Sequence, residues 1–173
     1  ENNTLQVVYQ NDPSRIRDEY EFSPSHLPKE ELQKLNVRCV LLNFALGCEI
    51  YTDGVDLPQE IFWQRMEAGQ TPKTSQPSPD AFLREFEAAK DAGDSVVCIL
   101  ISSALSGTMQ SALTAREMLG GEGIYVVDSR CASAGIHVLV EEARRMIAEG
   151  ANYRFRFPAD RFQKRVVQRR SLA

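Results

Sequence analysis

Apolar and polar positions form the clearest pattern in the second half of the chain. Ser95 to Ile101 is an unbroken apolar run of strand length, which is typical of a strand buried on both faces. Ile124 to Val127 is a second such run, and residues 107–119 and 133–149 are helix-compatible. Alternation of strand, helix, strand and helix predicts a parallel sheet with crossover helices.

Another helix is predicted to begin at Ser78-Pro79, because serine is a good N-cap and proline fits the first helical position. Its apolar residues recur at helical spacing and define one buried stripe, namely Phe82, Phe86 and Ala89. The last helix has a similar apolar face, formed by Ile136, Val140, Ala143 and Ile147. Both helices are therefore expected to pack on the sheet.

The first half of the chain carries weaker signals. Val37 to Leu42 predicts a strand, and Glu49 to Tyr51 predicts another that runs into an Asp53-Gly54 hairpin turn. Pro58 is expected to begin a helix, and residues 69–78 are expected to form a loop. The apolar side of that helix would carry Ile61, Phe62 and Met66.

Before residue 37 the pattern is faint. Residues 20–22 predict a short strand, and Pro28 is expected to open a short helix that ends near Leu35. We divide the chain into a poorly defined segment (1–20), an α/β domain (21–150) and an atypical arginine-rich tail (151–173).

Composition favours one globular core, since 43% of the residues are hydrophobic and 25% are charged. The net charge of −4 provides no overall field that would attract nucleic acid. The tail is different, because it is rich in arginine: Arg154, Arg156, Arg161, Arg165, Arg169 and Arg170.

The four cysteines are too widely spaced for a Cys-x-x-Cys metal site or a dense disulfide framework. We interpret them as reduced thiols of a cytoplasmic protein, and we expect no bound metal. No stretch of the sequence is long and apolar enough to suggest a membrane span.

Candidate chemistry lies where the two buried strands end, since ligands of open parallel sheets bind beyond the carboxyl ends of the strands. One end reads Ser102 to Thr108 and leads into a helix N-terminus, which favours an anion. The other end reads Asp128-Ser129-Arg130. On these residues alone, a simple helix cap at Ser106 is the better interpretation of the first end.

Taken together, four segments resemble the DegV family. They are Tyr51-x-Asp-Gly, the block Thr-Ser-Gln-Pro-Ser at 74–78, the block at 102–112, and Asp128-Ser129 with Gly135. The block at 102–112 reads Ser-Ser-x-Leu-Ser-Gly-Thr-x-Gln-Ser-Ala and is the most specific. The resemblance covers roughly residues 23 to 150.

This resemblance implies the family's α/β fold (the EDD fold), a parallel sheet with helices on both faces, and binding of a long-chain fatty acid. It implies that the carboxylate is bound by Thr74 and Ser106, with Ser75, Gly107 and Thr108 as neighbours in the same motifs. Ser23, Asp128 and Ser129 are further candidates. In several bacteria such proteins present the acid to a separate fatty-acid kinase, so a non-catalytic binding subunit without a cofactor is expected.

The sequence departs from the family pattern in two places. The usual Thr-Asp-Ser followed by Asp-Leu-Pro is represented only by Ser23 and Leu27-Pro28. The family's second domain, which closes over the lipid, is not recognisable in this chain. A degenerate, truncated family member without ligand is therefore one alternative.

Three other functions are alternatives to fatty-acid binding. A hydrolase with Ser106 as nucleophile would require a Gly-x-Ser-x-Gly elbow and a base, and the only histidines are His26 and His137. A small phosphate ester at the Ser106 helix N-terminus is a second alternative, for which only Arg130 is a nearby cation in the sequence. The arginine-rich tail as an interaction module is a third.

Overall fold

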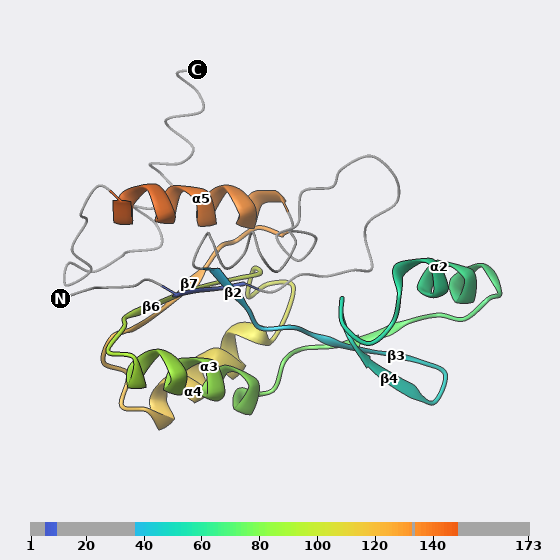
Figure 1. Cartoon of the computed structure of the whole chain (residues 1–173), viewed down its shortest axis with the longest axis horizontal. Coiled ribbons are helices and arrows are strands. Elements are labelled where there is room, and N and C mark those ends of the chain that lie inside the picture. Colours follow the sequence, from blue (N-terminus) through green and yellow to red (C-terminus); the bar gives the residue numbers. More distant parts are fainter. Residues whose placement is uncertain (1–5, 10–36, 133, 149–173) are drawn as a thin grey trace, which may run out of the picture.

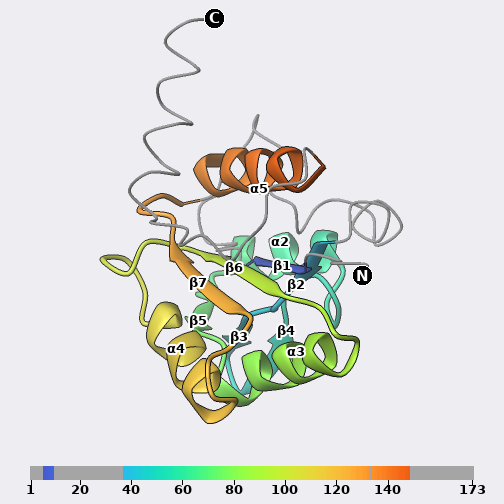
Figure 2. The ribbon, with the colours of Figure 1, turned by 90° about the vertical axis from the view of Figure 1, so that its left-hand side faces the viewer.

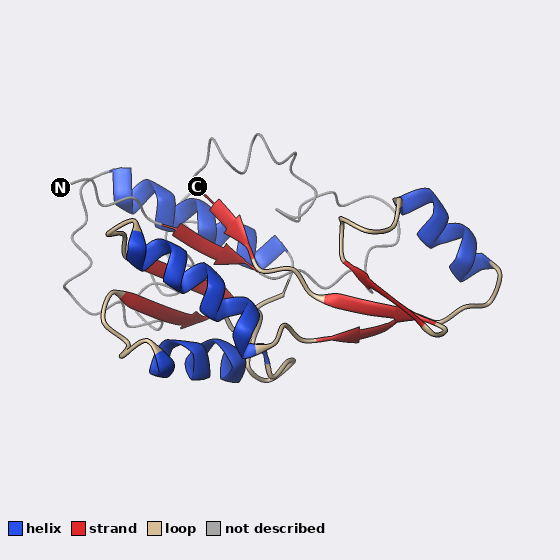
Figure 3. Cartoon of the chain, turned by 60° about the horizontal axis from the view of Figure 1, so that its bottom comes forward, coloured by secondary structure: helices blue, strands red, loops and turns tan. Residues whose placement is uncertain are grey.

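A four-stranded parallel sheet forms the body of the protein, and a smaller antiparallel sheet projects from one end of it (Figures 1 and 3). This computed structural model describes residues 6–9, 37–132 and 134–148. The strands of the parallel sheet lie in the order β2-β1-β6-β7. Their bounds are β1 (Gln6–Tyr9), β2 (Val37–Cys39), β6 (Val96–Leu100) and β7 (Ile124–Asp128).

Helices cover both faces of this sheet, as the sequence predicts (Figure 2). One face carries α3 (Pro79–Asp91) and α4 (Thr108–Met118), and the other carries α5 (Ala134–Ala148). All five residues of β6 are buried, and they alternate between the two cores. The prediction of a strand buried on both faces is therefore confirmed.

The start of α3 also follows the prediction. Ser78 is the N-cap, its Oγ accepts a hydrogen bond from the Ala81 N–H at 3.3 Å, and proline occupies the first turn. Phe82, Phe86 and Ala89 are fully buried against the sheet. An amphipathic pattern and a cap at the correct spacing are thus sufficient to specify this helix.

The smaller lobe consists of an antiparallel sheet and one helix (Figure 3). Its strands lie in the order β4-β3-β5, with bounds β3 (Asn43–Leu46), β4 (Glu49–Thr52) and β5 (Lys73–Ser75), and its helix is α2 (Gln59–Glu67). Phe44 and Leu46 of β3 pack with Phe62 of α2 in a core of their own. The Phe44 and Phe62 rings meet edge to face, with centroids 5.2 Å apart.

The predicted hairpin turn is wrong. The chain reverses at Gly47-Cys48 between β3 and β4, and Gly47 adopts a positive φ of 64° that glycine tolerates without strain. Asp53-Gly54 instead lies in the turn that follows β4. The predicted strand at 37–42 is also shorter, since β2 ends at Cys39.

Three further details differ from expectation. Strand β5 lies within the predicted loop at 69–78, and β1 occupies a segment for which no element is predicted. On α2, Phe62 is buried, whereas Ile61 is 40% exposed.

Several sequence predictions lie outside the described residues. These are the strand at 20–22, the helix at 28–35, the candidate Ser23 and the arginine-rich tail.

Candidate functional site

The loops after β6 and β7 meet at the carboxyl edge of the parallel sheet. Asp128 Oδ2 accepts a hydrogen bond from the Ser103 hydroxyl at 2.6 Å, and Oδ1 accepts one from the Ser103 N–H at 3.2 Å. The Arg130 N–H donates to the same Oδ1 at 2.9 Å. Because β6 and β7 are adjacent in the sheet, two segments that are 25 residues apart in sequence form one structured edge.

These hydrogen bonds stabilise the ionised form of Asp128. Partial burial acts to raise the pKa of this carboxyl, but the bonds from Ser103 and the Arg130 backbone outweigh it and hold the pKa below its usual value. Asp128 is therefore occupied in fixing the loop, which is a structural role in this arrangement.

The Ser129 side chain is also hydrogen-bonded within the loop. Its side chain is fully buried, its hydroxyl donates to the Cys131 carbonyl at 3.1 Å, and its Oγ accepts from the Cys131 N–H at 3.0 Å. The Cys131 carbonyl also accepts from the Ser102 N–H. Arg130, which lies between Ser129 and Cys131 in the chain, has a positive φ of 52°, which is uncommon for a residue other than glycine.

Ser106 and Thr108 form a hydroxyl pair at the start of α4. Their Oγ and Oγ1 atoms are 2.8 Å apart, and the Thr108 N–H also donates to Ser106 Oγ at 3.3 Å. Thr108 is fully buried, whereas Ser106 is only partly buried. No acidic side chain occupies the first turn of α4, and a helix N-terminus attracts negative charge.

Thr74 and Ser75 lie on β5, the edge strand of the small sheet. Thr74 is exposed and is paired with Phe44, whereas Ser75 is paired with Asn43. Successive side chains of a strand point to opposite faces, so these two hydroxyls point away from each other. The Ser75 hydroxyl donates to the Asn43 carbonyl at 3.3 Å and is used within the small sheet.

Gln76 joins the two halves of the predicted site. Its Nε2 donates to Ser111 Oγ of α4 at 3.3 Å. Its carboxamide also lies against Gly107, where an added Cβ would overlap the carboxamide oxygen. The segments at 74–76 and 106–111 are therefore side by side, as a common site requires.

Sequence reasoning placed Gln76 within a motif but assigned it no role. The signal in the sequence was the position of this residue, because a glutamine two residues after Thr74 can reach across to a neighbouring element. Which element it reaches depends on the fold, and spacing in the sequence does not reveal it.

The described part of the chain also bears on a metal site, a catalytic base and a membrane span. Across residues 6–9, 37–132 and 134–148, no three His, Cys, Asp or Glu side chains are grouped so that they could hold a metal ion. His137, the candidate base, lies within α5 on the opposite face of the sheet from α4. None of the described helices is long and apolar enough to cross a membrane.

The four cysteines are free thiols in different surroundings. Burial, with a smaller contribution from the Glu85 carboxylate, raises the pKa of the Cys39 thiol to about 11. Burial also raises the pKa of the Cys98 thiol, which is packed between the sheet and helices α3 and α4. Neither thiol has the depressed pKa expected of a nucleophile.

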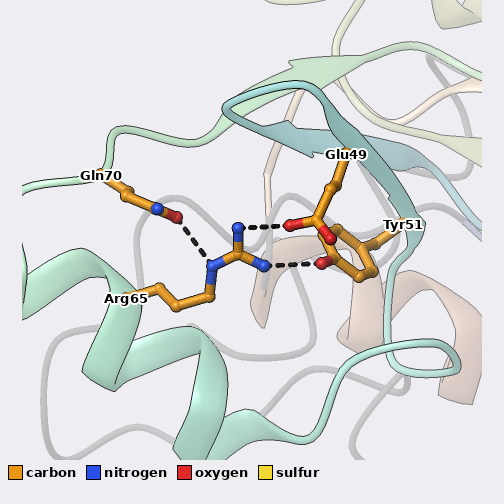
Figure 4. A network of polar contacts seen from close by, with 4 residues as sticks. All are labelled: Glu49, Tyr51, Arg65 and Gln70. Atoms are coloured by element: carbon orange, nitrogen blue, oxygen red, sulfur yellow. Dashed lines mark hydrogen bonds and ion pairs between the residues drawn. The ribbon is translucent and has the colours of Figure 1, made fainter.

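A second polar network stabilises the small lobe (Figure 4). The Arg65 guanidinium donates to Glu49 at 2.6 Å, to the Tyr51 hydroxyl at 2.6 Å and to Gln70 Oε1 at 2.7 Å. It also lies 5.6 Å from the centroid of the Tyr51 ring. The hydrogen bonds and charge of Arg65, with a contribution from Tyr51, lower the pKa of Glu49, so the network ties α2 to β4.

Comparison with known proteins agrees with the motifs. The sequence profile described as "Uncharacterised protein, DegV family" matches residues 23–154. A DegV domain-containing protein from Caldanaerobacter subterraneus subsp. tengcongensis is 37% identical over 130 residues, which are 75% of this chain and 46% of that protein.

Solved structures give the same result. The chain resembles a DegV family protein from Thermus thermophilus, described as fatty-acid binding, with a TM-score of 0.74 and 30% identity over 94% of this chain and 53% of that one. It also resembles a stearic-acid-binding protein from Eubacterium ventriosum, with a TM-score of 0.71 and 27% identity over 92% of this chain and 51% of that one. The chain thus spans about half the length of these proteins.

Proposed function

Because the chain belongs to the DegV family, we propose that it binds a long-chain fatty acid through hydrogen bonds from Ser106 and Thr74 to the carboxylate. The observation that supports this most is the juxtaposition of the two motifs, made by Gln76 of one and by Gly107 and Ser111 of the other. The similarity to the fatty-acid-binding protein from Thermus thermophilus supplies the ligand class.

The pairing of Ser106 with Thr108 suits Ser106 to donate to an anion. Thr108 is fully buried, and a buried hydroxyl is expected to hydrogen-bond. When Thr108 donates to Ser106 Oγ, the Ser106 proton is left for an external acceptor. A carboxylate would favour this direction, because chained hydroxyls polarise one another and the helix N-terminus attracts negative charge.

Thr74 is the second donor in this proposal, in preference to Ser75. Both side chains are exposed, but the Ser75 hydroxyl is engaged with the Asn43 carbonyl. Gln76 precedes Pro77, which favours an extended backbone, so Thr74 and Gln76 leave the chain on the same side. We propose that Thr74, like Gln76, faces the Ser106 side of the site.

Binding, and no catalysis, is the activity we propose. Neither buried thiol is activated, and Asp128 is held by the loop. We also propose that the protein presents the bound acid to a separate fatty-acid kinase. The family resemblance supports this proposal.

Affinity is expected to depend more on the acyl chain than on the head group. A hydrogen bond to a charged acceptor contributes about 1.5–3 kcal/mol, whereas each buried methylene contributes about 0.8 kcal/mol. Isothermal titration calorimetry should therefore show that Ser106→Ala weakens binding by roughly tenfold, and that removing four methylenes from the acid weakens it more.

Two variants serve as comparisons in that titration. Thr74→Val, which is nearly isosteric, should resemble Ser106→Ala. Ser95→Ala removes a hydroxyl beside the opposite end of β6 and should bind normally. Equal affinity for short and long acids would refute the proposal.

A further inference from the structure

Gly107 is a glycine that its own backbone does not require. Its φ of −74° and ψ of 3° are accessible to any residue. Gly47, Gly54 and Gly120, by contrast, have positive φ values and nothing within 4 Å of an added Cβ. The need for glycine at position 107 must therefore come from its surroundings.

Those surroundings are the Gln76 side chain. An added Cβ at Gly107 would overlap the Gln76 Oε1 and would lie 3.1 Å from its Cδ and Nε2. Contacts this short between a Cβ and a carboxamide are repulsive, and because the atoms involved are the far end of the exposed Gln76 side chain, the carboxamide is the group that would move. The glycine thus permits a close approach between a side chain of one segment and the backbone of another.

The other end of the carboxamide is fixed as well. Its Nε2 donates to Ser111 Oγ, and Ser111 is only 5% exposed. Gly107 and Ser111 are four residues apart, so they lie on one face of the helix. The carboxamide therefore lies along the first turn of α4, close to Gly107 and hydrogen-bonded to Ser111.

We propose that Gln76 is a positioning residue that sets the separation and direction of the Thr74 and Ser106 hydroxyls. It would do so through its close approach to Gly107 and its hydrogen bond to Ser111. This inference rests on the proposed function, since it concerns how the carboxylate donors are aligned. Gln76 is two residues from Thr74, and Gly107 is adjacent to Ser106. Without the carboxamide, Thr74 would be held mainly by the pairing of β5 with β3.

A double-mutant cycle tests this role. Gln76→Ala, Gly107→Ala and the double variant are titrated with palmitate and with the primary alcohol of the same chain length. Either single substitution should weaken palmitate binding by roughly tenfold and change alcohol binding by less than about twofold, because the alcohol lacks the charge that needs two aligned donors. Gln64→Ala, on an exposed position of α2, is the matched control.

The cycle should also be strongly non-additive. In the Gln76→Ala background, Gly107→Ala should change palmitate affinity by less than about twofold, since the side chain that it would strike is gone. The melting temperatures of the ligand-free proteins should show the same coupling, which gives a readout independent of binding.

Two results would overturn the proposal. One is additive effects of the two substitutions on both palmitate affinity and melting temperature. The other is equal loss of palmitate and alcohol binding, which would indicate a general structural effect. If the unmodified protein bound neither ligand, the proposed function would fail, while coupled melting temperatures would still establish the Gln76–Gly107 contact.

Discussion

At the scale of single residues, several hydroxyl groups in the described part of the chain hold the structure, and two others are those that we propose bind the ligand. Ser129 and Ser103 are engaged within the loops after β7 and β6, and Ser78 caps α3. The proposed ligand-binding hydroxyls are those of Ser106, which is partly buried and paired with Thr108, and Thr74, which is exposed. This division rests on burial and partners, which the sequence does not contain.

Asp128 provides a prediction at this scale. Asp128→Asn replaces a charged acceptor with a neutral one and should lower the free energy of unfolding by about 1 kcal/mol at pH 7, a modest value because the carboxyl is partly exposed. The folded-state pKa lies below the unfolded value, so this contribution is complete above the unfolded pKa, about 3.9, and is lost as pH falls through the folded pKa.

Urea denaturation of both proteins from pH 7 to pH 3 measures the effect. The difference between them should be constant near neutrality and should shrink below about pH 4. Glu122→Gln, at an exposed turn position, is the control and should show no such trend. A difference that grows toward low pH would contradict the assignment.

At the scale of elements, the Arg65 network links the hairpin of the small lobe to its helix. Three hydrogen bonds from one guanidinium join β4, α2 and the segment after α2 (Figure 4). A lysine at this position offers a single ammonium group and cannot reproduce the planar fork. Arg65→Lys should therefore loosen the hairpin while leaving the parallel sheet intact.

Hydrogen exchange followed by mass spectrometry can measure this. Amides of β3 and β4 should exchange several-fold faster in Arg65→Lys, and those of β6 should be unchanged. Arg144→Lys, which alters an exposed ion pair within α5, should leave both regions unaffected. Faster exchange throughout the protein would show that the lobe does not unfold as a separate unit.

The elements with long, regular patterns could be predicted from the sequence. The apolar run gave the bounds of β6 to within a residue, and the Ser78-Pro79 cap gave the start of α3. In contrast, β5 has three exposed residues, Lys73 to Ser75, and so carries no hydrophobic signal. Its strand conformation comes from pairing with β3, which is a tertiary effect.

The hairpin shows a similar limit. Asp53-Gly54 is a strong local turn signal, yet the reversal occurs at Gly47-Cys48, where it lets Phe44 and Leu46 face α2. For the site, the motifs identified the two segments, but the contact between Gln76 and Gly107 links residues 31 positions apart. Only the fold reveals that contact.

At the scale of the whole molecule, the candidate site lies where the parallel sheet and the small lobe come together. Ser106 belongs to the carboxyl edge of the first, and Thr74 belongs to the edge strand of the second. A ligand held by both would connect the two lobes. The chain covers about half the length of its relatives.

The most direct test is to extract lipid from the purified protein under denaturing conditions and to identify it by mass spectrometry. We predict a fatty acid in approximately stoichiometric amount, lost or strongly reduced in a Thr74→Ala/Ser106→Ala double variant that still folds. A protein that carries no fatty acid, and takes up none when a long-chain acid is added, would contradict the account.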